Sequence, residues 1–155
     1  MNPLPQAWLL TLAPNIRIAV AETQMLEYLL DSPPIPIPLT PAHCSSITFW
    51  RHKIVPLLNI NKRHLNPALD DYQQPYAGIQ ILHYQHQTED NAPPEAKFIG
   101  IPVQTPPERI KLANDEIEAA DKLQQNTWRS ALISSFKHEN CAVSVVDFSR
   151  LVAVI

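Results

Sequence analysis

Residues 41–60 read PAHCSSITFWRHKIVPLLNI, and they combine features that one regular element rarely holds together. An aromatic pair, Phe49 and Trp50, precedes Arg51, and the apolar run that follows is interrupted by Pro56. Because a proline donates no hydrogen bond to a sheet, we predict that KIVPLLNI is a strand at a sheet edge or a bulge. A charge so close to apolar neighbours is expected to reach water or a partner, which favours a presented Arg51 over a buried one.

The length and composition indicate a globular protein. With 155 residues, the chain can form one domain, or two small subdomains that share a core, without a disulfide or a metal. The net charge of −3 argues against a nucleic-acid binder, which needs a basic face to neutralise phosphates. The first residues lack the basic region of a signal peptide, no run reaches the ~18 apolar residues of a membrane span, and Cys44 and Cys141 are far apart. We therefore predict a soluble, cytoplasmic protein.

Glycine is scarce and proline abundant, with 2 and 16 residues respectively. Loops that cradle phosphates need several glycines, because backbone amides must approach the anion closely. Gly78 and Gly100 are isolated from each other, which excludes a P-loop and a dinucleotide fingerprint. No nucleotide cofactor is predicted.

Short apolar runs between turn signals predict a mainly β protein. Residues 8–12 and 17–21 are expected to form a hairpin, and residues 78–87 are expected to pair with residues 97–104. The proline-rich residues 32–41 should be an extended connector, whereas residues 25–30 fit either a helical turn or a strand. Thr105, Pro106 and Glu108 resemble the start of a helix, and residues 141–155 read as a strand followed by a helix or a second strand.

The two halves of the chain contain a similar segment. VPLLNINK at residues 55–62 and VSVVDFSR at residues 143–150 each have an apolar strand, Asn59 or Asp147, one more apolar residue and a basic end. Asn or Asp at the end of a strand can cap the turn that follows. This similarity suggests a duplicated β subdomain.

The side chains that could carry chemistry are scattered. A metal-dependent enzyme could use His43, Cys44, His83 and His86, but residues three apart on a strand point to opposite faces, so we favour isolated histidines. No serine or cysteine lies in a nucleophile motif, and the acidic pairs lie in predicted loops. We therefore predict no catalytic residue and no metal, and the metal enzyme stays as the less favoured reading.

Residues 41–60 resemble the hallmark of the CheW-like domain of bacterial chemosensory systems, G-V-[IT]-N-L-R-G-x-[IV]-[IV]-P-[IV]-[IV]-D-L. Residues 8–30, WLLTLAPNIRIAVAETQMLEYLL, are similar to the opening of the family, with Met25 and Glu27 at its V and E positions, and CAVSVVDFSRLV is similar to its end. The resemblance spans nearly the whole chain and is loose between residues 70 and 128. The chain departs from the hallmark at its two glycines, its asparagine and its aspartate, which are here Ser46, His52, Phe49 and Asn59.

The resemblance implies a mainly β fold of two small five-stranded β-barrel subdomains with a few short helices, as a single CheW-like domain over residues 1–155. It also implies a non-enzymatic adaptor that couples the cytoplasmic tips of chemoreceptors to the regulatory domain of a CheA-type histidine kinase, without direct membrane insertion. The expected partner-binding residues are Met25, Glu27, Ser46, Trp50 and Arg51. The alternative is a divergent CheW-like module that serves another partner, for example in pilus motility or regulation.

Overall fold

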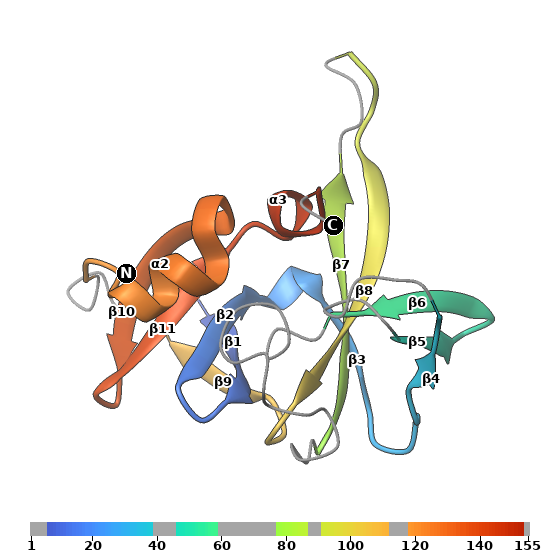
Figure 1. Cartoon of the computed structure of the whole chain (residues 1–155), viewed down its shortest axis with the longest axis horizontal. Coiled ribbons are helices and arrows are strands. Elements are labelled where there is room, and N and C mark those ends of the chain that lie inside the picture. The colour runs from blue at the N-terminus through green and yellow to red at the C-terminus, as the bar shows by residue number, and fades with distance from the viewer. Residues whose placement is uncertain (1–5, 39–45, 59–76, 87–90, 112–117, 154–155) are drawn as a thin grey trace.

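The computed structural model describes residues 6–38, 46–58, 77–86, 91–111 and 118–153, and most of them lie in two sheets (Figure 1). The first sheet has the order β10-β11-β2-β1-β9. Its strands are β1 (Gln6–Ala13), β2 (Ile16–Ala21), β9 (Glu108–Lys111), β10 (Leu132–His138) and β11 (Cys141–Val146). This sheet includes the predicted hairpin, now seen as β1 and β2.

The second sheet has the order β3-β7-β8-β6-β5-β4. Its strands are β3 (Met25–Leu29), β4 (Ile35–Pro36), β5 (Ser46–Trp50), β6 (Lys53–Leu57), β7 (Gly78–His86) and β8 (Glu95–Val103). The predicted pairing of β7 with β8 is confirmed, and residues 25–29 form a strand rather than a helical turn. The mainly β fold in two sheets is thus as predicted, with the two-residue β4 as a sixth strand in the second sheet.

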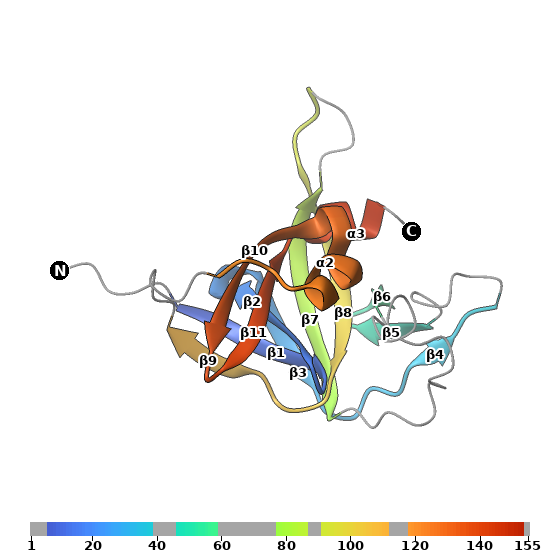
Figure 2. The same cartoon turned by 60° about the vertical axis from the view of Figure 1, so that its left-hand side comes forward.

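The two sheets share one hydrophobic core. Buried side chains of β1 and β2, such as Leu10 and Ile18, belong to the same cluster as Leu82 and Ile101 of β7 and β8. The helix α3 (Phe148–Ala153) follows β11 and reaches β7, so it links the sheets (Figure 2). Smaller clusters lie within each sheet, one lined by β1, β2, β9, β10 and β11, the other by β5, β6 and β7.

The prediction of a helix that starts at Thr105 is wrong. Residues Glu108–Lys111 form β9, which pairs antiparallel with β1 and buries Ile110. This burial and pairing outweigh the local capping signal, which is a weak preference. The helix in this region, α2 (Lys122–Trp128), starts later, where Asp121 and Gln124 form a reciprocal capping box.

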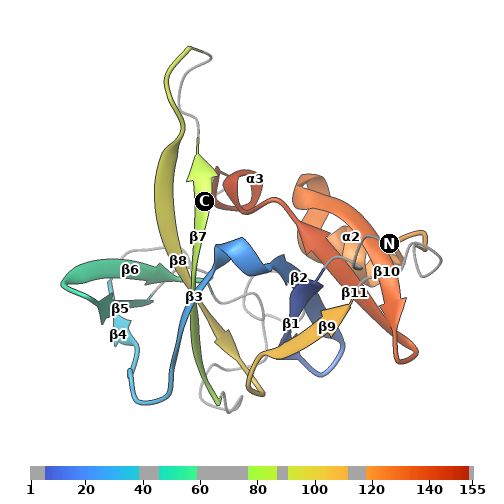
Figure 3. The same ribbon diagram turned by 180° about the vertical axis from the view of Figure 1, so that it is seen from behind.

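The similarity between the two halves extends to whole hairpins, which lie at opposite ends of the molecule in Figure 3. The turn between β5 and β6 is Arg51–His52, with φ of 48° and 65°, and the turn between β10 and β11 is Glu139–Asn140, with φ of 51° and 64°. Two successive positive φ values are typical of a type I′ turn, the connection that matches the twist of a two-residue hairpin. The cross-strand pairs are equivalent too, from Trp50 with Lys53 and His138 with Cys141 to Ser46 with Leu57 and Ser134 with Val145, beyond which the β10–β11 register shifts.

Pro56 is tolerated without an edge or a bulge, which corrects the prediction for residues 53–60. The strand β6 lies inside the sheet, between β8 and β5, and its pairing with β5 is regular. Its parallel pairing with β8 is confined to Leu57, opposite Gly100. The proline thus lies on the part of β6 that has no registered partner on β8, so its missing donor costs little.

Candidate partner-binding site

Arg51 lies in the turn at the end of the β5–β6 hairpin. Its side chain is 69% exposed, and His52, the second turn residue, is exposed as well. Hairpin pairing fixes the backbone on either side, from Trp50 opposite Lys53 onward. A cation is therefore presented at a defined place on a rigid element.

Glu27 and Trp50 hold this cation in position. Trp50 is buried on the inner face of β5, and its indole Nε1 donates a hydrogen bond to Glu27 Oε2 on β3. Arg51 Nε lies 3.6 Å from the same carboxylate oxygen, and the guanidinium carbon lies 4.9 Å from the centroid of the Trp50 ring. Since β3 and β5 are not neighbours in the sheet, the hydrogen bond also shows that the sheet curls back on itself.

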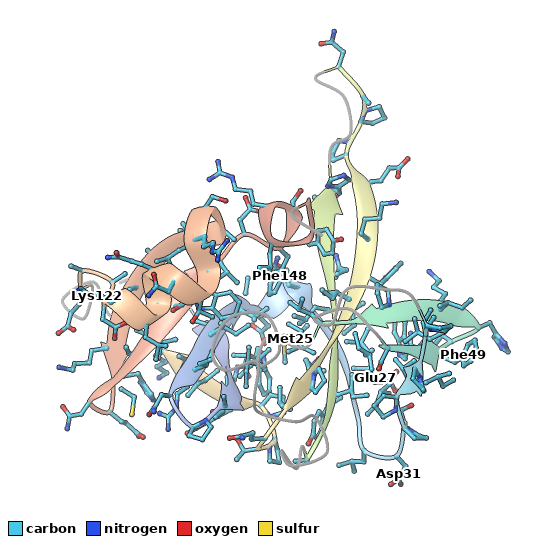
Figure 4. All side chains as sticks on the ribbon, viewed as in Figure 1. Met25, Glu27, Asp31, Phe49, Lys122 and Phe148 are labelled. Carbon is cyan, nitrogen blue, oxygen red and sulfur yellow. The ribbon has the colours of Figure 1, made fainter. Side chains whose placement is uncertain are left out.

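Met25 and Ser46 lie apart from these three residues. Met25 is half-buried and packs against the shared core, and an irregularity in the β3–β7 register separates it from Glu27 (Figure 4). Ser46 lies at the opposite end of β5 from Trp50 and pairs with Pro36 and Leu57. The structure thus brings together Glu27, Trp50 and Arg51 out of the five predicted binding residues.

A second cation, Lys53, lies beside Arg51, and reasoning from the sequence did not identify it. Lys53 Nζ is 4.1 Å from the centroid of the Phe98 ring on β8, and Phe98 packs against Trp50 with ring centroids 5.7 Å apart. Attraction between a cation and an aromatic face is worth about 0.5–1 kcal/mol at exposed sites. Lys53 could have been found as the residue that must pair with Trp50 across a two-residue turn, whereas Phe98 comes from a distant strand.

The histidines considered as metal ligands do not form a cluster in the described part of the chain. His83 Nε2 lies 2.6 Å from the backbone oxygen of Thr23, and His86 Nδ1 lies 2.9 Å from Ser149 Oγ on α3. No group of three or more His, Cys, Asp or Glu side chains that could hold a metal occurs among the described residues. His43 and Cys44 lie outside the described residues, and Cys141 is a free thiol.

Within the residues that the structure describes, no helix has the length and apolar character needed to span a membrane. The two α-helices of this described part, α2 and α3, have 7 and 6 residues.

The chain matches no family model and no curated protein in sequence. Its fold is similar to the crystal structure of the scaffolding protein TtCheW from Thermoanaerobacter tengcongensis, with a TM-score of 0.71 and 16% sequence identity. The similarity covers 97% of this chain and 89% of that protein. At this identity the likeness concerns the fold, and it agrees with the resemblance of residues 41–60 to the CheW-like hallmark. The chain is therefore a divergent protein with the CheW-like fold.

Proposed function

We propose that this chain is a non-enzymatic chemosensory adaptor of the cytoplasm, a single domain over residues 1–155 that couples chemoreceptor tips to the regulatory domain of a CheA-type histidine kinase. The observation that carries the proposal is the presentation of Arg51. It stands 69% exposed on a type I′ turn, held by a carboxylate and an aromatic ring. A cation that served only to stabilise the sheet would not need this exposed, pre-oriented position.

The surroundings of Arg51 suit the recognition of a protein helix. A charge fixed at the rim of an interface sets the orientation and register of the partner, while apolar contacts supply most of the affinity. Glu27 and Trp50 would act by positioning Arg51, because Trp50 is buried and the Glu27 carboxylate interacts with both Trp50 and Arg51. Met25 and Ser46 would contact a partner only if the interface extends along β3 and β5.

Calorimetric titration tests the proposal. The purified chain should bind the purified regulatory domain of the CheA-type kinase from the same organism with micromolar or tighter affinity. A fragment of a receptor tip should bind in a separate titration, and Arg51→Glu should weaken that binding at least about tenfold, as loss of a central charged contact does. Arg109→Glu is the matched control, because Arg109 on β9 forms a comparable exposed ion pair with Glu22.

A second candidate is a CheW-like module with a different protein partner, such as one of pilus motility. Phe49 favours it, because this side chain stands at the asparagine of the hallmark and is 57% exposed. If the folded wild-type chain binds neither the regulatory domain nor the receptor fragment, this second function replaces the first.

A further inference from the structure

Two aromatic rings hold the cations of the β5–β6 hairpin. Trp50 and Phe98 pack with their ring centroids 5.7 Å apart. The guanidinium carbon of Arg51 lies 4.9 Å from the Trp50 centroid, and Lys53 Nζ lies 4.1 Å from the Phe98 centroid. A cation within about 6 Å of a ring centroid is attracted to the face of the ring. Both cationic side chains are therefore held at one pair of rings, and both are exposed.

The charges at these rings do not balance. Arg51 Nε lies 3.6 Å from Glu27 Oε2, so this carboxylate compensates part of the charge of Arg51. Lys53, by contrast, forms no ion pair with any residue that the structure describes. The uncompensated positive charge of the site therefore belongs to Lys53, in a chain whose net charge is −3.

Arg51 and Lys53 suit different tasks. A guanidinium is a planar fork that orients a carboxylate, whereas a lysine ammonium is a compact point charge. The Nε atom is the part of Arg51 near Glu27, which leaves the terminal nitrogens Nη1 and Nη2 for a carboxylate of a partner. The net charge of a site governs how fast an oppositely charged partner arrives. Arg51 thus sets the orientation of the partner, and Lys53 sets the attraction.

The two cations select an element with two carboxylates. A single carboxylate would leave one cation unpaired, because Arg51 and Lys53 lie over different rings. Two carboxylates three or four residues apart lie on one face of a helix and can complement both cations. A phosphate backbone fits less well, since a nucleic-acid binder typically makes about 6–10 phosphate contacts.

We propose that Lys53 is a further specificity-determining residue of the site around Arg51, and that the element bound there carries two carboxylates, one for each cation. The inference rests on the proposed function, in which this element belongs to a receptor tip. It deepens that function, because Lys53 is not among the five residues predicted from the sequence and because it defines the chemistry of the bound element.

Calorimetric titration with a purified receptor-tip fragment from the same organism tests the role of Lys53. Lys53→Met keeps the length of the side chain without its charge and should weaken binding at least about threefold, and Lys53→Glu should weaken it at least about tenfold. Lys111→Glu is the matched control and should bind like the wild type, because Lys111 is an exposed lysine of β9 without an ion pair among the described residues. Melting curves verify that each variant is folded. Unchanged affinity in both folded Lys53 variants would overturn the inference.

Charge reversal on the receptor fragment tests the number of carboxylates. Each Asp or Glu of the fragment is replaced by Lys in turn and titrated against Lys53→Glu and Arg51→Glu. One replacement should restore binding of Lys53→Glu at least about tenfold without restoring Arg51→Glu, and a different one should do the reverse. A single replacement that restores both variants, or the lack of any that restores Lys53→Glu, would overturn the inference.

Stopped-flow kinetics separate the two cations. Lys53→Met should lower the association rate constant and its dependence on salt, whereas Arg51→Gln should mainly raise the dissociation rate constant. Equal association rate constants for Lys53→Met and the wild type would overturn the role assigned to Lys53. A wild-type chain that does not bind the receptor fragment would overturn the proposed function and this inference with it. Wild-type binding that is unaffected at Lys53 would overturn this inference alone.

Discussion

Arg51 and Trp50 both interact with one atom, Oε2 of Glu27. The indole Nε1 donates to it from inside the sheet, and Arg51 Nε lies 3.6 Å from it at the surface. The side chains of Arg51 and Glu27 are 69% and 41% exposed, and an ion pair in water contributes only about 0–1 kcal/mol to folding. The arrangement therefore orients Arg51 more than it stabilises the protein.

Arg51→Gln should accordingly change the free energy of unfolding by less than about 1 kcal/mol. The side chain is exposed, and Trp50 keeps its hydrogen bond to Glu27 in the variant. Urea denaturation followed by tryptophan fluorescence measures the change. Collapse of the fold in this variant would show instead that Arg51 is a structural residue.

The hydrogen bond between Trp50 and Glu27 should contribute more to stability, because the indole is buried. Trp50→Phe removes the donor and part of a ring that packs on Phe98. Hydrogen bonds to charged groups are worth about 1.5–3 kcal/mol, and the partial exposure of Glu27 puts our expectation at the lower end. A double-mutant cycle with Glu27→Ala, which removes the acceptor, should give a coupling energy of about 1.5 kcal/mol in the free energy of unfolding. Additive effects of the two substitutions would mean that no such bond stabilises the closed sheet.

His52→Gly should stabilise the protein. His52 has φ of 65°, a left-handed conformation that costs a residue with a Cβ about 1–2 kcal/mol. Glycine avoids this cost, but it loses more conformational entropy on folding, which offsets about 0.5–1 kcal/mol of the gain. We expect a net gain of about 0.5–1 kcal/mol in the free energy of unfolding. Asn140→Gly, at the equivalent turn position with φ of 64°, is the matched control and should gain less, because asparagine tolerates this region. Destabilisation by His52→Gly would indicate that the imidazole makes contacts that outweigh the strain.

Gly100→Ala should destabilise the second sheet by about 1–3 kcal/mol, the usual cost of overpacking. A Cβ at this position would lie 2.5 Å from Leu57 Cδ2 and 3.1 Å from Ile79 Cγ2, both of them buried. The absence of a side chain at Gly100 is thus needed where β6 meets β8. Ala96→Ser, at an exposed position of the same strand, is the control and should leave the melting temperature almost unchanged. Equal melting temperatures for both variants would contradict this account of Gly100.

The strands that carry clear alternation could be predicted from the sequence. The pairs β1–β2 and β7–β8 follow from apolar runs and turn signals. The capping role of Asp147 follows from the repeated segment. The strand β9 could not, because its pairing with β1 depends on residues about 100 positions away. A capping signal near Thr105 reports only local preference, and tertiary pairing overrode it.

The candidate site was predictable in part. The hallmark pointed to Arg51, and the hairpin geometry explains why this residue is exposed. Its contact with Glu27 crosses from β5 to β3, a relation that appears only when the sheet curls. The apolar outer face of β5 had a signal, since Ile47 and Phe49 alternate with Thr48 and Trp50. A strand with apolar residues on both faces is equally typical of a fully buried strand, so exposure had to come from the structure.

Asp147→Ala should destabilise the link between the two sheets, because α3 joins them. Asp147 Oδ1 accepts hydrogen bonds from the backbone amides of Ser149 and Arg150, at 3.0 and 3.3 Å, and the loss of such a cap costs about 0.5–2 kcal/mol. Asp121→Ala, which removes the capping box of α2, is the matched control: it should cost a similar free energy of unfolding. The two variants should differ in hydrogen exchange, because α3 carries Phe148 against Tyr84 and Ser149 beside His86 of β7. Amides of β7 should lose protection in Asp147→Ala and keep it in Asp121→Ala. Equal protection of β7 in both variants would mean that α3 does not couple the sheets.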